Sequence, residues 1–326
     1  MAGYTDSVFR QIAQSLGAAY AVSEMISSLA LVHGDTKTAA LAGIGENESG
    51  TVLQIFGHDP SAMAEAAEML LSRDFPGCSY KNPPAGIDIN MGCPVKKITS
   101  SGDGSALMKS PDTAAKITEA CAAVCRRYSV PLSVKLRLGW DENSINAPEF
   151  AALLAGSGAD KLTLHTRTRE QLYSPSARPE FCLRVREAVP DNIVLVGNGD
   201  ISSLADAEKY LSYGCGEVAV GRAALGNPWL FTELSTGEKH TPDTDEIINL
   251  AVEFTRRVVQ LKGEYTGVRE ARGRAAHFIK GMRGSAGVRD RLNRAETEAE
   301  FEEILDSLRG QRDESRGTLR SSAAPH

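Results

Sequence analysis

The sequence lacks several features that would place it in a membrane, secreted or metal-binding class. Its 326 residues contain no apolar run of 18 residues and no charged start followed by an apolar stretch, so neither a membrane span nor a signal peptide is indicated. The six cysteines are scattered without a Cys-x-x-Cys pair, which favours neither a disulfide framework nor a zinc site. We therefore expect a cytoplasmic protein that binds neither membrane nor metal.

The composition and the pattern of the chain predict a large α/β domain. Hydrophobic residues make up 42% of the sequence, enough for one large core and a smaller one. Runs rich in β-branched residues alternate with helical patterns, which predicts a parallel sheet with crossover helices. The expected strands are residues 19–25, 51–56, 85–91, 132–138, 161–166, 193–197 and 217–221, and the expected helices are 7–16, 61–71, 112–127, 148–156, 179–189 and 203–212.

The even spacing of these strands favours a (β/α)8 TIM barrel over an open doubly wound sheet. The nearest glycine fingerprint, residues 214–219, precedes a strand instead of following one, which is the wrong context for a dinucleotide fold. Only seven strands can be counted. Because the chain opens on a segment entering a helix, with Asp6 or Ser7 as its N-cap, we expect the first barrel strand to lie before Met1.

The pattern changes after Pro228, where the strands stop. Residues 235–245 are typical of a linker, and three helices are expected at 245–262, 267–283 and 295–308. The predicted organisation is therefore a β/α barrel at residues 1–235, a small all-helical domain at 236–310 and a disordered polar tail at 311–326.

Polar residues stand at the C-terminal end of every predicted strand. In a β/α barrel these ends form the mouth where reactive groups project, and a core strand gains nothing from ending in a polar group. We therefore expect a lined pocket. The strand ends carry Glu24, Gln54, Asn90 with Cys93, Lys135 with Arg137, His165 with Arg167, Asn198 with Asp200, and Arg222.

The last two predicted strands indicate a phosphorylated ligand. "VLVGNGDI" and "VAVGRAAL" each place a glycine where a backbone approaches something closely, and the corresponding loops of barrels commonly hold a phosphate. Arg222 adds a forked donor. Lys135, amid alternating apolar residues, and His165 would face the same ligand and stabilise negative charge on it.

Cys93 stands where a strand-like run stops, on a Gly-Cys-Pro turn. A thiol on a rigid turn at a strand end has the placement that acid or nucleophile chemistry requires. No catalytic histidine is paired with it in a recognisable arrangement, so proton donation is favoured over covalent attack. The other cysteines are interpreted as buried apolar residues.

The stretch "GIDINMGCPVKKITSSGDGSALM", residues 86–108, resembles the tRNA-dihydrouridine synthases, and most closely their bacterial B-type branch. Further matches are "MAGYTDSVFR", "SEM", "QIFG", "VKLRLGW", "LHTRTREQLY", "GNGDI" and "VGRAALGNPWLF". The resemblance is strong over about residues 1–235 and weaker over the helical domain, through "GVREARGRAAHFIK".

The resemblance implies a cofactor, a substrate and a role for each matching residue. NADPH would reduce FMN, flavin N5 would deliver hydride to carbon 6 of a tRNA uridine, and Cys93 would protonate carbon 5 to give 5,6-dihydrouridine. Asn90 would help to hold the base. The implied FMN contacts are Met1, Ala2, Gln54, Lys135, His165, Asn198, Gly199, Asp200, Gly221 and Arg222.

Positive charge is concentrated in the helical domain. Residues 256–294 contain eleven lysines and arginines against three acids, a local net charge of +8 in a chain whose total is −6. Such segregation is typical of an RNA footprint. Drawn as one helix, the segment places Arg269, Arg272, Lys280 and Arg283 on a single stripe. We expect this stripe to bind tRNA through its phosphates and the enzyme to act as a monomer.

Two other functions remain open at this point. One is a flavin barrel acting on a free pyrimidine, as dihydroorotate dehydrogenases do, against which the basic helical domain argues. The other is a non-catalytic RNA-binding protein with a degraded barrel, against which Cys93, Lys135, His165 and Arg222 argue.

Overall fold

The computed structural model describes residues 3–309. The chain divides into two compact units, Met1–His240 and Thr241–His326, which we call the barrel unit and the helical unit. Met1 and Ala2, two of the predicted FMN contacts, and the predicted tail at 311–326 lie outside the described residues.

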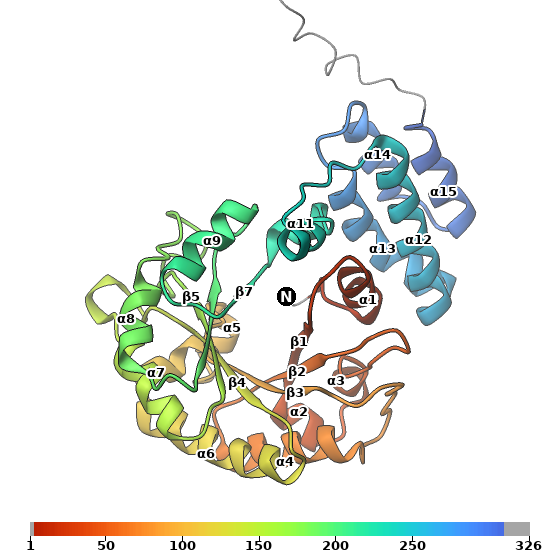
Figure 1. Ribbon diagram of the computed structural model, residues 1–326. Helices are drawn as coiled ribbons and strands as arrows, with labels where there is room; N and C mark the ends of the chain where they lie inside the picture. Colours follow the sequence, from red (N-terminus) through yellow and green to blue (C-terminus); the bar gives the residue numbers. More distant parts are fainter. Residues whose placement is uncertain (1–2, 310–326) are drawn as a thin grey trace, which may run out of the picture. The chain divides into compact units, whose positions relative to one another are not determined.

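The barrel unit is built on one parallel sheet of seven strands in chain order (Figure 1). The strands are β1 (Ala21–Ser27), β2 (Thr51–Phe56), β3 (Gly86–Asn90), β4 (Leu132–Arg137), β5 (Lys161–His165), β6 (Val194–Asn198) and β7 (Glu217–Ala219). Within the described residues β1 and β7 are the edge strands. The Tyr20 hydroxyl, just before β1, donates to Glu217 of β7 at 2.8 Å. The sheet therefore curls, and the predicted TIM-barrel class is confirmed.

Helices cover the outer side of this sheet, with α4, α6, α7 and α8 around its strands (Figure 1). The helices of the barrel unit are α1 (Ser7–Ser15), α2 (Ser28–Val32), α3 (Thr36–Ala40), α4 (Pro60–Ser72), α5 (Lys96–Thr99), α6 (Pro111–Arg127), α7 (Ala147–Gly156), α8 (Phe181–Ala188), α9 (Leu204–Ser212), α10 (Arg222–Gly226) and α11 (Leu230–Thr236), with short 3₁₀ helices η1 (Gly104–Lys109) and η2 (Glu142–Ser144). The core lies between the sheet and these helices, filled by aliphatic residues such as Ile55, Ile89 and Leu164.

Local capping explains where several helices begin. Asp6 accepts a hydrogen bond from the Phe9 amide at 2.8 Å, and Asp59 caps α4 through Ala62 at 2.7 Å, because an N-cap carboxylate satisfies an otherwise unpaired amide. Of the two N-caps predicted for α1, Asp6 is the one observed.

Some predicted boundaries were wrong. β1 begins two residues later than expected, and Tyr20, just before it, donates a hydrogen bond to Glu217 instead. β7 ends at Ala219, two residues earlier than expected. The five-residue helices α2 and α3 were missed because they are too short to show a helical period. The predicted linker at 235–245 begins inside α11, which ends where Gly237 adopts a left-handed conformation at φ 76°.

The helical unit consists of α12 (Thr244–Lys262), α13 (Glu264–Phe278), α14 (Ser285–Leu292) and α15 (Glu298–Asp306). Its core includes Phe254 and Phe278, whose rings meet edge to face at 5.7 Å. The single helix predicted at 267–283 was wrong. α13 ends at Phe278, and the chain turns through Gly281 and Gly284 at φ 89° and 76°, conformations that favour glycine and end a helix.

A buried ion pair ties α1 to the segment that leads into β2. The Arg10 guanidinium donates to Glu48 at 2.7 Å, and the two side chains are 2% and 0% exposed. Arg10 also donates to the carbonyls of Thr5 and Gly43 at 2.8 and 2.6 Å, and Glu48 accepts from the Thr51 hydroxyl at 2.7 Å. The pair is fully hydrogen-bonded, which offsets the cost of removing both charges from water.

Replacing Arg10→Met is expected to lower the free energy of unfolding by about 3–5 kcal/mol, because Glu48 would remain buried without its countercharge. Urea denaturation measures this loss. The matched control is Lys116→Met, on an exposed position of α6, which we expect to change stability by less than about 0.5 kcal/mol. Equal losses in the two variants would contradict the assigned role of the pair.

Candidate active site at the C-terminal ends of the strands

Cys93 is held by hydrogen bonds on both sides of its backbone. The Asn90 side-chain oxygen accepts from the amides of Gly92 and Cys93 at 3.2 and 2.8 Å. The Cys93 carbonyl accepts from the Ser105 amide and hydroxyl at 3.1 and 2.9 Å. The residue is 9% exposed. The thiol therefore stands on a fixed backbone at the end of β3.

Gly104 allows the η1 turn to approach this cysteine. It has φ +59°, and a Cβ at this position would lie 2.9 Å from the Cys93 carbonyl oxygen and 3.1 Å from its Cβ. A side chain here would push the Cys93 turn away or distort the backbone. The Gly104-Ser105 pair therefore fixes the position of the thiol.

A chain of hydrogen bonds crosses β4, β3 and β2 beneath this turn. Asp88 accepts from the Ser133 hydroxyl at 2.5 Å and from the Gln54 side-chain nitrogen at 2.6 Å. The Gln54 oxygen in turn accepts from Asn90 Nδ2 at 3.0 Å. Burial raises the pKa of Asp88. Its bond from Gln54, together with the bond from Asn90 to Gln54, orients both side-chain amides. Asn90 then presents its oxygen to the Cys93 turn.

The network also shows what the sequence reasoning missed. Asp88 and Ser133 were not named as site residues, yet both are buried and hydrogen-bonded within it. The available signal was the two-residue period of a strand: Asp88 precedes Asn90, and Ser133 precedes Lys135, by two positions. Polar residues at alternate positions share one face of the sheet.

Lys135 and Arg137 bring positive charge to the end of β4. Arg137 donates to the Gly92 carbonyl at 2.8 Å and to the Thr168 carbonyl at 2.8 Å, so it joins the Cys93 turn to the loop after β5. Burial lowers the pKa of Arg137 to about 10. The Lys135 ammonium has no hydrogen-bond partner among residues 3–309; burial and the neighbouring Arg137 lower the pKa of Lys135 to about 8.

His165 ends β5 in register with Arg137 and Asn198. It is 6% exposed, and burial, followed by the charges of Lys135 and other nearby cations, lowers its pKa far below the usual value. The imidazole is therefore neutral at physiological pH. It can accept or donate a hydrogen bond to a ligand at the mouth but cannot serve there as a cation.

Asp200 joins two arginines at the end of β6. It pairs with the buried Arg167, and Arg222 donates to it at 3.0 Å. Burial raises the pKa of Asp200, but the bonds from Arg167 and the Ala177 amide outweigh this, so the net shift is downward. The carboxylate stays ionised and holds Arg222, whose guanidinium also lies 4.4 Å from the Tyr173 ring centroid.

The structure thus gathers most of the predicted mouth residues at one edge of the sheet. Asn90 and His165 end β3 and β5, Cys93 follows β3, and Gln54 and Lys135 lie two residues before the ends of β2 and β4. Asn198 ends β6 and donates to the Ala219 carbonyl at 2.7 Å. Gly199 and Asp200 follow it, and Gly221 and Arg222 open α10. Glu24 lies within β1 instead of at its end.

The four predicted RNA contacts do not form the single helical stripe that was expected. Lys280 and Arg283 are exposed in the turn after α13. Arg269 stacks on the Tyr265 ring at 3.6 Å. Arg272 donates through two nitrogens to the Ala295 carbonyl, at 3.1 and 2.5 Å, which ties α13 to the segment after α14. The stripe assumed a helix that continues past Phe278, and this one does not.

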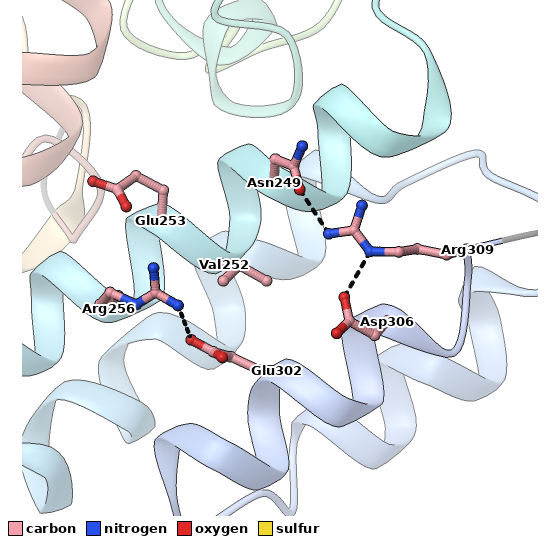
Figure 2. Close-up of a pocket in the computed structure, with 7 residues that line it drawn as sticks. All are labelled: Asn249, Val252, Glu253, Arg256, Glu302, Asp306 and Arg309. Carbon is pink, nitrogen blue, oxygen red and sulfur yellow. Dashed lines mark hydrogen bonds and ion pairs between the residues drawn. The ribbon is translucent and has the colours of Figure 1, made fainter.

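The helical unit contains a hollow of about 440 Å³ between α12 and α15 (Figure 2). Its charges largely pair with each other: Arg256 with Glu302 at 2.8 Å, and Arg309 with Asp306 at 2.7 Å. None of the predicted catalytic or cofactor residues lines it. Because its arginines are neutralised, we assign this hollow no ligand.

No helix between residues 3 and 309 is long and apolar enough to cross a membrane. Over the same range, no group of three or more His, Cys, Asp or Glu side chains is placed to hold a metal ion.

Fold and site together define a TIM-barrel-like α/β protein. Toward the strand ends it carries a fixed thiol, a neutral buried histidine and an ammonium that has no hydrogen-bond partner in the described part of the chain. Residues 1–312 match the sequence profile of the family described as "Dihydrouridine synthase (Dus)". The chain belongs to the dihydrouridine synthase family.

Individual relatives agree with this assignment. A "Probable tRNA-dihydrouridine synthase" of Rickettsia bellii is 36% identical over 90% of this chain and 88% of its own length. The "tRNA-dihydrouridine synthase B" of Pseudomonas aeruginosa is 36% identical over 90% and 86%. A variant of NCR from Zymomonas mobilis has a TM-score of 0.49 at 16% identity, over 74% of this chain and 86% of that one; no conclusion rests on that likeness.

Removing the Lys135 charge is expected to stabilise the ligand-free protein in a pH-dependent way. The pKa of Lys135 falls from 10.5 to about 8 on folding, so the folded protein bears an unfavourable ammonium below pH 8. This penalty fades as the pH rises from about 8 to about 10.5, where the folded chain loses a proton that the unfolded chain keeps.

Urea denaturation of Lys135→Met should therefore show its largest stability gain over wild type near neutral pH and a shrinking gain up to about pH 10. Lys116→Met is the control for a lysine in solvent and should show no such trend. A gain for Lys135→Met that is constant from neutral to alkaline pH would contradict the assigned pKa.

Proposed function

We propose that this chain reduces uridine to 5,6-dihydrouridine in tRNA, with FMN as its bound cofactor and NADPH as the reductant. The observation that carries the proposal is the position of Cys93: within a chain of this family, a thiol is fixed at the sheet edge that also carries Lys135 and His165. The names of the Rickettsia and Pseudomonas relatives supply the tRNA substrate.

The residues at the mouth fit an anionic, hydrogen-bonding flavin. Lys135 offers an ammonium with no hydrogen-bond partner among residues 3–309, and a buried cation of this kind is compensated when an anionic or electron-rich group binds beside it. Gln54 and neutral His165 would contact the ring system. The Asn198–Asp200 segment, Gly221 and Arg222 would hold the phosphate, with Asp200 keeping the Arg222 guanidinium in place.

The flavin, when bound and reduced, would supply the hydride that adds to carbon 6 of the uracil. The remaining work belongs to side chains of this protein. Cys93 gives its proton to carbon 5, so that the C5–C6 double bond gains one hydride and one proton. Asn90 holds the backbone of the Cys93 turn, and its amide nitrogen faces Gln54. Lys135 offsets negative charge that develops on the ring during the transfer.

The target base must leave its stack to reach Cys93, because the thiol is only 9% exposed. Extrusion costs a few kcal/mol, and less where the base is weakly paired. Phosphate contacts from the basic segment 256–294 would offset part of this cost. Lys280 and Arg283, exposed and without ion pairs among the described residues, are its best candidates for RNA contact.

We propose that the enzyme acts in the cytoplasm as a monomer.

Changing Cys93→Ala should leave flavin binding intact and abolish most of the activity. We expect the flavin absorbance of the purified variant to equal that of wild type, and the rate of dihydrouridine formation to fall by about 10²-fold or more, as the loss of a positioned proton donor predicts. The rate is followed by mass spectrometry of unmodified tRNA incubated with NADPH. Cys78→Ala, in the loop before β3, is the control and should retain full activity.

Undiminished turnover by Cys93→Ala would remove the proton-donor role. Wild-type protein that purifies without a flavin chromophore and gains none from added FMN would overturn the cofactor assignment. Reduction of free uracil or orotate in place of tRNA would favour the alternative of a free-pyrimidine enzyme.

A further inference from the structure

Two cations lie over one tryptophan at the rim of the barrel unit. The Lys109 ammonium is 3.7 Å from the Trp140 ring centroid, and the Arg169 guanidinium carbon is 4.5 Å from it. Three different loops supply these side chains: Lys109 ends η1, Trp140 follows β4 and Arg169 follows β5. Bringing two positive charges to one ring is unfavourable unless the ring, solvent or a ligand compensates them.

No carboxylate of the described chain neutralises this pair. Neither Lys109 nor Arg169 makes an ion pair within residues 3–309, and the Arg169 Nε atom is buried without a hydrogen-bond partner there. The nearby Glu142 is engaged elsewhere, by Arg178 at 2.9 Å and by Gln171 at 2.7 Å. Within residues 3–309 both cations therefore lack an ion-pair partner, and the buried Arg169 Nε lacks an acceptor.

Hydrogen bonds connect the loops of the cluster to the Cys93 turn. η1, which ends at Lys109, begins at Gly104 and anchors the Cys93 carbonyl through Ser105. Asn146 donates to the Met108 carbonyl at 2.9 Å, and the Arg169 amide donates to the Gly139 carbonyl at 2.9 Å. Arg137 links the Gly92 carbonyl to the Thr168 carbonyl. The cations therefore share one rigid frame with the thiol.

We propose that Lys109, Trp140 and Arg169 form a binding site for a phosphodiester of the RNA strand that flanks the extruded uridine. The proposal rests on the tRNA substrate assigned above. A guanidinium presents paired N–H donors that match a phosphate, and an ammonium adds a point charge. Stacking on Trp140 holds both side chains in place, which reduces the entropy lost when the phosphate binds.

A phosphate of NADPH has the same chemistry as a phosphate of RNA. The position of the cations on the loops that fix Cys93 favours the RNA phosphate. The loops that carry the cations are those that fix Cys93, and the thiol acts on the uridine, not on the nicotinamide. A phosphate held by loops that are hydrogen-bonded to the Cys93 turn would position the nucleotide to which it is covalently joined. The experiment separates the two sources.

The test compares two double variants of the full-length chain that lose equal charge. Lys109→Gln/Arg169→Gln removes both proposed contacts. Arg184→Gln/Lys209→Gln removes two exposed charges from α8 and α9 on the outer side of the sheet. Affinity for an unmodified tRNA transcript is measured by fluorescence anisotropy over a range of salt concentrations, and flavin reduction by NADPH is measured without tRNA.

We expect the first variant to bind tRNA roughly tenfold more weakly at low salt. Its slope of log affinity against log salt should fall by about 1, because one phosphate contact is lost. The control should bind as wild type does, and flavin reduction should be unchanged in both. Equal affinity and slope for the first variant and wild type would overturn the proposal, as would slowed flavin reduction with tRNA affinity intact.

Those failures are distinct from failure of the proposed function. If wild-type protein binds tRNA and forms dihydrouridine while the first variant is unaffected, only the phosphate site is overturned. If wild-type protein neither binds nor modifies tRNA, the proposed function fails and this site fails with it.

Discussion

The arrangement of the mouth depends on the hydrogen bonds that hold the backbone of Cys93. Asn90 accepts from the amides before the thiol, and Ser105 donates to the carbonyl behind it. The Asn90 oxygen faces these amides because the Asn90 side-chain nitrogen donates to Gln54, whose own side-chain nitrogen donates to Asp88. Side chains from β2 and β3, in parallel register with β4, therefore fix the backbone of Cys93.

The buried positive charges around this turn lower the stability of the ligand-free protein, and they can stabilise an anionic ligand. Lys135 is half-buried and Arg137 is buried. Burial lowers the pKa of each. Arg137 is compensated by carbonyls and Arg167 by Asp200, but Lys135 is left without a hydrogen-bond partner among residues 3–309. Local destabilisation of this kind is typical of functional sites, where a ligand supplies the missing interaction.

The sequence predicted the strands of the sheet and many of the polar residues near their C-terminal ends. Alternating apolar runs located all seven strands, and the polar residue at the end of each run located Gln54, Asn90, Lys135 and His165, because parallel strands end at one edge. The hydrogen bonds of Asp88 could not be predicted, since they join residues up to 45 positions apart. The pairing of Lys109 and Arg169 over Trp140 likewise depends on how three loops meet.

The error in the helical unit has a physical cause as well. Placing Arg269, Arg272, Lys280 and Arg283 on one stripe required an unbroken helix, but Gly281 and Gly284 adopt positive φ and turn the chain. Arg272, counted as an RNA contact, donates to the Ala295 carbonyl. A charge count along the sequence identifies a basic segment; only the fold shows which of its cations are engaged.

The proposed function requires a tRNA uridine to lie against the Cys93 thiol. The most direct measurement is the rate at which iodoacetamide alkylates Cys93, followed by peptide mass spectrometry, with and without unmodified tRNA. We expect tRNA to slow this alkylation strongly and heparin of equal total charge to leave the rate unchanged. Alkylation of Cys93 at the same rate with and without saturating tRNA would contradict the proposed function.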